Sequence, residues 1–259
     1  MVALEVPVEK IPYIRTIEGR KFRAGKWEFP DSAITKLQQY GLIDANIEIP
    51  KKEIVHYELS PHLRKYQKDI VNKALNEGSY GIFSDTGTGK TLMGLEIAKH
   101  YGKTLILCPL SVIETAWVDD CKKFYPELII TNCWANSSKK RFEAMDINSD
   151  VYVMNYESFK ILKKKILTMD FQCVIVDESQ VMKNMGAQIT NELLKLVDVI
   201  PHRFVLSGTP TPNHNSEIFP QMKFVDADVF GNNFFGFQAH YFTQDMQNPH
   251  RWYQTQENK

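Results

Sequence analysis

The feature that most constrains this chain is a glycine-rich loop between an apolar run and a helical pattern. The apolar run 80–83 leads into the loop at 84–91, and the helical pattern begins at Leu92. Gly87 and Gly89 allow backbone conformations closed to other residues, so successive N–H groups can converge on phosphate oxygens. The following helix presents unpaired N–H groups and the positive end of its dipole to the same anion. This order of strand, loop and helix predicts a phosphate-binding domain of the α/β class.

Individual residues of the loop have predicted roles in binding ATP and Mg²⁺. Lys90 would place its charge at the β- and γ-phosphates, and Thr91 would offer a hydroxyl group to the Mg²⁺ ion. Ser84 stands at the first position of the pattern G-x-x-x-x-G-K-[ST], a departure that a small side chain tolerates. The predicted nucleotide-binding residues of the loop are Asp85, Thr86, Gly87, Thr88, Gly89, Lys90 and Thr91.

An acidic pair, Asp177 and Glu178, follows another apolar run at 172–176. An acid at the tip of a parallel strand lies at the carboxyl edge of the sheet, where open α/β folds bind ligands. Asp177 is therefore a candidate for holding the Mg²⁺ ion that Thr91 also meets. Glu178 is a candidate for orienting and deprotonating the attacking water. With Lys90 at the phosphates, we predict that these two acids complete the catalytic set.

From residue 56 onward, apolar runs of strand length alternate with helical patterns. Fully apolar strands separated by helices are typical of a parallel sheet that is covered by helices on both faces. We expect one such domain over 56–259, with a first helix that opens at Ser60 and Pro61 and runs to about Leu75. The remaining apolar runs are 104–108, 127–132, 151–154 and 203–206.

Residues 1–55 predict a separate small domain of α+β class and ββα type. The segment 11–17 alternates apolar and polar residues as a half-buried strand does, and 21–23 and 26–29 have the same character. The segment 34–40 places its apolar residues on one face of a helix. Because basic side chains suit phosphates and aromatic rings stack on bases, this domain is a candidate for binding nucleic acid. Alternatively, its aromatic residues form the small core and its charges are only solvated. The predicted nucleic-acid residues here are Arg15, Arg20, Lys21, Arg23, Lys26 and Trp27.

Composition and charge limit the possible partners and the cellular location of the protein. The formal net charge is zero, so a nucleic-acid partner would have to meet a local basic patch. No apolar run approaches the roughly 20 residues that cross a bilayer, and the N-terminus lacks the organisation of a signal peptide. The four cysteines have no CxxC spacing, which is typical of reduced, buried thiols. We expect an intracellular protein without membrane contact, in the cytoplasm or nucleoid of a bacterium or in a virus-infected host cell, with a nuclear location left open.

Six ordered segments resemble the motifs of superfamily-two helicases, and most of all those of Swi/Snf-type double-strand DNA translocases. They are 63–67 (LRKYQ), 84–91, 105–111 with Trp117 beyond it, 152–157 (YVMNYE), 174–184 (VIVDESQVMKN) and 206–210 (LSGTP). The resemblance implies a RecA-like ATP-binding lobe in which Gln67 reads the adenine edge. It also implies that Pro109 and Ser111 contact the nucleic-acid backbone.

The same resemblance assigns a coupling role, between the ATP state and the grip on nucleic acid, to Gln180, Ser207, Gly208 and Thr209. Gln180 stands where the family usually has His, and its protonation cannot vary. This departure puts the strength of coupling in doubt, not the binding of ATP. The segment 11–30 is similar to the HepA-related (HARP-type) domain of annealing helicases and to units on phage branch-migration helicases.

In this family a second RecA-like lobe supplies the arginines that stabilise the transferring phosphate. No segment after Asn213 resembles the motif that carries them. We therefore expect either a truncated motor, whose second lobe lies in cis, or a chain that works with a partner, and favour truncation. The chain alone should hydrolyse ATP very slowly, because such an arginine contributes about 10³- to 10⁵-fold in rate.

The resulting functional hypothesis is an ATP-dependent DNA translocase or helicase that remodels branched or annealing DNA. An RNA-directed helicase is a runner-up, which the context DESQ-x-x-KN disfavours. A non-catalytic, nucleotide-gated DNA-binding module stays open as an alternative, because no segment of this sequence resembles the arginine-bearing motif of the second lobe. A small-molecule kinase with the same phosphate loop is a third alternative. It does not explain the presence of Gln67, the segment 207–209 or the N-terminal unit.

Overall fold

The structure of the protein is a computed structural model that covers residues 2–7, 10–14, 17, 20–23, 26–29, 33–43, 53–244 and 252–254. The chain forms two compact units. One is Val55–Asp226, and the other contains Met1–Ile54 and Ala227–Lys259. The first unit begins near the predicted boundary at residue 55. The segment after Asp226, predicted to belong to the large domain, groups with the N-terminal residues instead.

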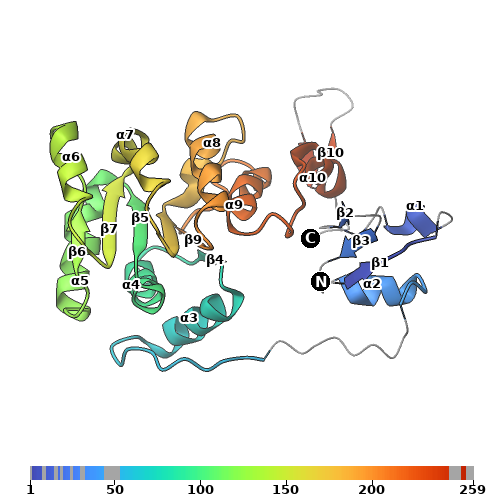
Figure 1. The fold of residues 1–259 in the computed structure, drawn as a ribbon, viewed down its shortest axis with the longest axis horizontal. Coiled ribbons are helices and arrows are strands. Elements are labelled where there is room, and N and C mark those ends of the chain that lie inside the picture. Colours follow the sequence, from blue (N-terminus) through green and yellow to red (C-terminus); the bar gives the residue numbers. More distant parts are fainter. Residues whose placement is uncertain are drawn as a thin grey trace. The chain divides into compact units, whose positions relative to one another are not determined.

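The larger unit is built on a six-stranded sheet with the order β4-β9-β8-β5-β7-β6 (Figure 1). Every pair of neighbouring strands in it is parallel. Each strand coincides with one of the apolar runs, because a parallel strand covered on both faces needs apolar side chains on both. The strands are β4 (Tyr80–Phe83), β5 (Thr104–Cys108), β6 (Ile130–Asn132), β7 (Val151–Asn155), β8 (Cys173–Asp177) and β9 (His202–Ser207).

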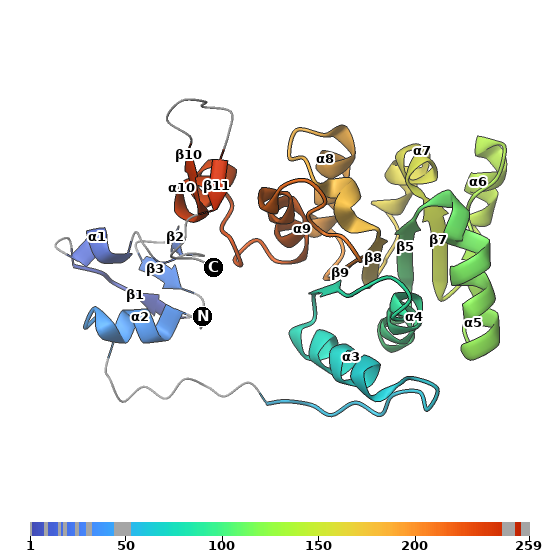
Figure 2. The same cartoon turned by 180° about the vertical axis from the view of Figure 1, so that it is seen from behind.

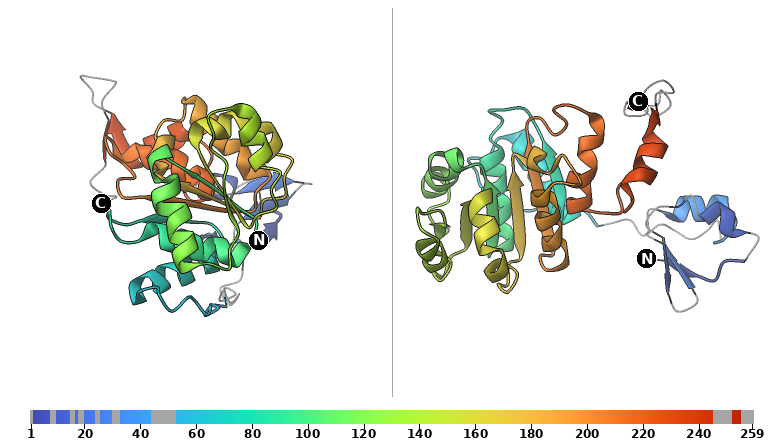
Figure 3. Two further views of the ribbon diagram at one scale, coloured as in Figure 1. Left: turned by 90° about the vertical axis from the view of Figure 1, so that its left-hand side faces the viewer. Right: turned by 90° about the horizontal axis from the view of Figure 1, so that it is seen from above.

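Helices cover both faces of this sheet (Figure 2 and Figure 3). One face carries α3 (Lys65–Glu77), α4 (Lys90–Tyr101) and α5 (Asp119–Phe124), whose apolar residues form one buried cluster with the strands. The other face carries α7 (Tyr156–Ile166), α8 (Gln188–Leu194) and α9 (Ile218–Val225), which enclose a second cluster. The short α6 (Ser138–Ala144) precedes β7. The layered α/β arrangement confirms the predicted fold class.

The first helix of this unit begins later than predicted. α3 starts at Lys65, and Arg64 caps it through a backbone N–H that donates to Gln67 Oε1 at 2.8 Å. Ser60 is instead part of a turn, and its N–H donates to Glu96 Oε1 at 3.1 Å. A contact with α4, more than thirty residues away, therefore displaces the start expected from the local Ser-Pro signal.

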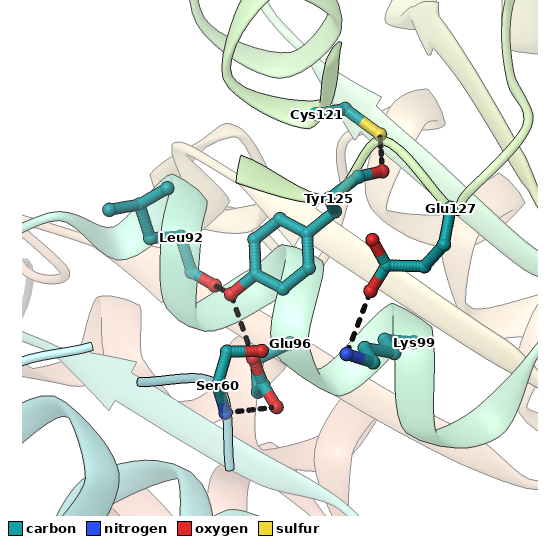
Figure 4. A network of polar contacts seen from close by, with 7 residues as sticks. All are labelled: Ser60, Leu92, Glu96, Lys99, Cys121, Tyr125 and Glu127. Carbon is teal, nitrogen blue, oxygen red and sulfur yellow. Dashed lines mark hydrogen bonds and ion pairs between the residues drawn. The ribbon is translucent and has the colours of Figure 1, made fainter. Parts of the chain in front are cut away.

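Glu96 is the centre of a buried polar network (Figure 4). Its side chain is 4% exposed, and it accepts a hydrogen bond from the Tyr125 hydroxyl group at 2.9 Å as well as from Ser60. The same hydroxyl group lies 3.1 Å from the carbonyl oxygen of Leu92. The network thus joins the turn before α3, helix α4 and the end of α5, and each buried polar group in it has a partner.

The N-terminal residues form a small antiparallel sheet of β1 (Val2–Leu4), β2 (Lys21–Arg23) and β3 (Lys26–Phe29) in the order β1-β3-β2. α2 (Ile34–Gln39) confirms the helix expected from residue 34. The strand expected over 11–17 is wrong, because Ile11–Ile14 forms the short helix α1. Ile14 and Ile17 both enter the small core at helical spacing, which alternation alone did not reveal.

The C-terminal residues contribute α10 (Phe234–Tyr241) and an antiparallel pair, β10 (Phe242–Gln244) and β11 (Trp252–Gln254). All four cysteines are free and buried, as expected. Within the described ranges, no helix is both long and apolar enough to cross a membrane.

Candidate nucleotide site

The glycine-rich loop connects β4 to α4, as its pattern predicts. Gly87 and Gly89 have φ angles of 81° and 79°, in the left-handed region that glycine adopts without strain. A Cβ atom at Gly89 would also lie 2.3 Å from Gln67 Nε2, so a side chain there would displace the Gln67 amide from the loop. α4 begins directly at Lys90, and its first N–H groups therefore face the loop. The loop therefore has the left-handed glycines and the adjoining helix start that its sequence pattern predicts.

Side chains within the loop hold its shape. Lys90 Nζ donates to the carbonyl oxygens of Ser84 and Asp85, at 2.8 and 3.0 Å. Thr88 Oγ1 lies 2.8 Å from Ser84 Oγ and donates to the Asp85 carbonyl oxygen at 2.8 Å. The serine that replaces the first glycine of the pattern thus adds a hydrogen bond across the loop instead of disturbing it.

Gln67, predicted to read adenine, lies against this loop. Its Oε1 accepts from the N–H of Arg64, and its Nε2 donates to the Thr88 carbonyl oxygen at 2.9 Å. The Tyr66 hydroxyl group donates to the same oxygen at 2.8 Å. Gln67 is 4% exposed, so in this structure it braces the loop. Its contact with a base stays a prediction.

The acidic pair stands at the end of β8, which neighbours β9 and β5 in the sheet. Asp177 accepts a hydrogen bond from Trp117 Nε1 at 3.1 Å on Oδ2 and from the N–H of Glu178 at 2.9 Å on Oδ1. Burial raises the pKa of Asp177 above its ordinary value, and the Trp117 hydrogen bond opposes this rise. Charge attraction to Lys90 also lowers this pKa, with a smaller effect than the burial and the Trp117 hydrogen bond.

Glu178 has a φ angle of 50°, which makes it the one non-glycine residue with positive φ in the described chain. Left-handed backbone at a residue with a side chain costs of the order of 1–3 kcal/mol and is concentrated at functional sites. Its carboxylate accepts a hydrogen bond from Gln180 Nε2 at 2.7 Å. The strained backbone and this side-chain contact together set the direction of the carboxylate.

The predicted coupling residues continue from Glu178 as a line of hydrogen bonds. Gln180 Oε1 accepts from Ser207 Oγ at 2.7 Å, and Ser207 Oγ in turn accepts from the N–H of Thr209 at 3.0 Å. Gly208 lies beside the phosphate loop, since a Cβ atom there would be 3.2 Å from Thr86 Oγ1. The acid strand, the end of β9 and the phosphate loop are therefore in direct contact.

The sequence analysis did not single out Gln221, a residue of α9 whose side chain forms hydrogen bonds in the same region. It is fully buried, and its Oε1 accepts from Ser179 Oγ at 2.7 Å. Its Nε2 donates to the carbonyl oxygens of Pro210 and Glu217, at 2.6 and 3.0 Å. The one available signal was an amide in the apolar segment 218–225. Gln221 ties the turn after β8 to the turn after β9.

Two predicted nucleic-acid residues lie at the same edge of the sheet. Pro109 directly follows β5 and is partly exposed, and Ser111 is exposed in the short helix η3 (Leu110–Val112). Trp117, which belongs to the same resemblance, is fully buried and contacts Asp177 instead. The first two positions are accessible to a partner, and the tryptophan is not.

In the small domain, Arg20 Nη1 donates to the Ile17 carbonyl oxygen at 2.6 Å, and Lys26 Nζ is 4.0 Å from Glu5 Oε1. Trp27 is half-buried against the small core, so it is in part a core residue. Arg15, and the side chains of Lys21 and Arg23, lie outside the described residues.

Residues 50–259 match the SNF2-related domain. The chain belongs to this family. The match includes the phosphate loop, the acidic pair and the end of β9. The family assignment covers the segment after Asp226 as well, which the compact unit Val55–Asp226 does not include.

Proteins similar to this SNF2-related chain include the Caenorhabditis elegans homolog of SWI/SNF-related matrix-associated actin-dependent regulator of chromatin subfamily A-like protein 1. It is 32% identical over 179 residues, which cover 67% of this chain and 26% of the relative. The Bos taurus DNA annealing helicase and endonuclease ZRANB3 is 28% identical over 190 residues, 67% of this chain and 17% of the relative. The chain thus spans about a quarter or less of these relatives.

Among solved structures, the Sulfolobus solfataricus SWI2/SNF2 ATPase core in complex with dsDNA superimposes with a TM-score of 0.60 at 22% identity. The alignment covers 73% of this chain and 41% of the other. At this identity the comparison establishes the fold. It confirms the RecA-like α/β class.

Proposed function

We propose that this SNF2-related lobe binds and hydrolyses ATP as part of a DNA translocase that remodels branched or annealing DNA. The observation that carries the proposal is the hydrogen-bond line from Glu178 through Gln180 and Ser207 to Thr209. It joins the proposed water-activating acid to the end of β9, beside the phosphate loop. A fold that only stored a nucleotide would not need this link.

The residues of the site divide the chemistry among them. The loop N–H groups and Lys90 bind the phosphates, and Glu178 orients the attacking water and accepts its proton. Thr91 and Asp177 would hold Mg²⁺, since a hydroxyl group and a carboxylate are oxygen ligands of the kind it prefers. When bound, Mg²⁺ would neutralise charge on the phosphate oxygens. The burial of Asp177 beside Lys90 fits that role, because a bound cation would compensate a partly desolvated carboxylate.

DNA is the proposed partner because a similar solved structure is named as an ATPase core in complex with dsDNA, and one relative is named a DNA annealing helicase. Pro109 and Ser111 would contact the backbone at the carboxyl edge of the sheet. We propose that residues 1–55 act as a HARP-like accessory domain that adds affinity for DNA. Their basic side chains would contribute through the phosphates rather than through base recognition.

The decisive test is Glu178→Gln in the full-length protein. The substitution keeps the shape of the side chain and removes its ability to take a proton. We expect unchanged binding of Mg-ATP and a loss of turnover of about 10²-fold or more. Glu143→Gln, at an exposed position on α6, is the matched control and should turn over normally.

Measured with single-stranded, duplex and forked DNA and with RNA, the same assay separates the functional classes. Stimulation by duplex or forked DNA supports the proposal. Stimulation by RNA alone would point to an RNA-directed helicase. Nucleotide binding without any turnover in the parent protein would mean a nucleotide-gated binding module.

A further inference from the structure

Two aromatic side chains, Trp117 and Tyr156, contact Asp177 at different groups. Trp117 Nε1 donates to the carboxylate, and the Tyr156 hydroxyl group donates to the carbonyl oxygen of the same residue. Asp177 is thereby held both at its side chain and at its backbone. Neither donor belongs to the phosphate loop or to the line from Glu178 to Thr209, so the chemistry described above does not use them.

The side chain of Trp117 is enclosed by its neighbours. It lies in η4 (Ile113–Val118), a π-helical segment of the kind often found at functional sites, and is fully buried. Its ring packs against α4 at Gly94, where an added Cβ atom would be 2.7 Å from the Cη2 atom. α4 is the helix that begins with Lys90 and Thr91. Trp117 therefore fills the space between the helix of the phosphate loop and the acid of β8.

Tyr156 holds Asp177 at its backbone. It is the first residue of α7, directly after β7, and packs on the second apolar cluster of the sheet. Its hydroxyl group also lies 3.4 Å from the carbonyl oxygen of Leu107 in β5. Because β5 stands between β7 and β8, this one hydroxyl group spans the sheet edge from α7 to the end of β8.

We propose that Trp117 and Tyr156 are positioning residues that set the orientation of Asp177 for a divalent cation. The inference rests on the proposed function, since it assigns the cation to Asp177 and Thr91. Partners that orient a metal-binding carboxylate typically change metal affinity by about 10- to 100-fold when they are removed. A purely structural pair would change the stability of the protein and leave the cation requirement alone.

The experiment titrates Mg²⁺ against binding of a fluorescent ATP analogue to the whole chain, and repeats the binding in EDTA. Tyr156→Phe removes only the hydroxyl group, and Trp117→Phe removes the indole N–H. We expect each variant to need roughly 10-fold more Mg²⁺ for half-saturation. Binding in EDTA should match the parent protein, because Lys90 and the loop N–H groups are untouched.

Matched controls exist for both variants. Tyr152→Phe removes another buried hydroxyl-to-carbonyl bond, from β7 to Ile147, away from the site. Trp134→Phe changes a partly buried tryptophan that packs on the same cluster as Trp117. Both should keep the Mg²⁺ requirement of the parent protein. If Trp117→Phe does not fold, the tyrosine pair decides the question alone.

The outcomes separate this inference from the proposed function. An unchanged Mg²⁺ requirement in Tyr156→Phe overturns the positioning role while Mg-ATP binding by the parent protein stands. An equal increase in Tyr152→Phe would also overturn it, because the effect would then be general. A parent protein whose nucleotide binding ignores Mg²⁺ would reject the cation site and with it this inference, whereas the proposed function is tested separately by the turnover of Glu178→Gln.

Discussion

The side chain of Gln180 acts as a hydrogen-bond donor at one end and as an acceptor at the other. Its amide donates to Glu178 through Nε2 and accepts from Ser207 through Oε1, so both ends are used. A neutral histidine also offers one donor and one acceptor, but it gains a proton in mild acid and then has only donors. The amide has no such change. The link between the acid and the end of β9 is therefore independent of pH at this residue.

Gln180→Glu tests the link at this residue. The new carboxylate would face Glu178 and repel it, although Ser207 could still donate. We expect Mg-ATP binding to be retained and turnover to fall roughly 10- to 100-fold, corresponding to the ~1.5–3 kcal/mol of a hydrogen bond to a charged group. Steady-state hydrolysis of the full-length protein measures this. Gln188→Glu, an exposed position on α8, is the control, and equal losses in both variants would contradict the role of the link.

Lys90→Ala should abolish or weaken nucleotide binding by at least about 10-fold, because a charged donor to the phosphates is removed. The side chain bonds to loop carbonyl oxygens and not to the core, so the melting temperature should change little. Equilibrium binding and thermal unfolding are the two measurements. Lys99→Ala on the same helix removes an exposed ion pair with Glu127 and should bind nucleotide normally. A Lys90 variant that binds as tightly as the parent chain would refute the site.

Among the elements, α4 is held in place by contacts with distant parts of the chain, which its own sequence does not predict. Glu96 accepts hydrogen bonds from the turn before α3 and from the residue at the end of α5. The ring of Trp117 packs against Gly94. A glycine inside a helix costs about 1 kcal/mol relative to alanine. Its presence here is explained by the close approach of the indole ring and not by local backbone preference.

Gly94→Ala should therefore destabilise the protein despite the better helix propensity of alanine. The added methyl group would meet the indole ring at 2.7 Å, and overpacking of this kind typically costs about 1–3 kcal/mol. Denaturant unfolding measures the free-energy change. Gly236→Ala in α10 is the matched control, since its nearest neighbour atom would be at 3.7 Å, and it should be neutral or stabilising. A stabilised Gly94 variant would show that the indole ring can move aside.

At the scale of the whole molecule, we propose different roles for the two compact units. Val55–Asp226 contains the nucleotide site, and the unit with the N-terminal residues contains the proposed accessory contacts. The formal net charge of zero means that any attraction to DNA must come from local groups such as Arg20 and Lys26. Lysines of α7 are poorer candidates, because Lys163 and Lys165 pair with acids more closely than the 4.0 Å that separates Lys26 from Glu5, and their side chains are less exposed.

Removal of residues 1–55 should lower DNA affinity and reduce its salt dependence. Every DNA phosphate that these residues neutralise in the full chain contributes roughly 0.7 to 0.9 to the slope of log K against log salt, so the shortened chain should have a shallower slope. Binding isotherms at several salt concentrations, for the full chain and for a chain starting at His56, give both slopes. Replacement of Lys163 and Lys165 by Gln is the control and should leave the slope unchanged. Equal DNA binding by the shortened chain would reject the accessory role.

The sheet and the phosphate loop could be predicted from the order of residues alone. Parallel strands that are covered on both faces must be apolar throughout, so the apolar runs marked all six strands of the larger unit. The loop chemistry is equally local, because Gly87, Gly89 and Lys90 act within one turn of chain. The acidic pair could be related to that loop because it follows a strand of the same sheet, whereas the segment 207–209 was related to it only by the resemblance to superfamily-two helicases.

Features that depend on partners far apart in the chain emerged only from the folded arrangement. Trp117 and Asp177 are 60 residues apart, and Gln221 and Ser179 are 42 apart, so no local pattern relates them. The same holds where prediction failed, since Ser60 is drawn into a turn by Glu96 on α4. Local propensity is worth only a few tenths to about one kcal/mol per residue, and buried long-range hydrogen bonds and packing outweigh it.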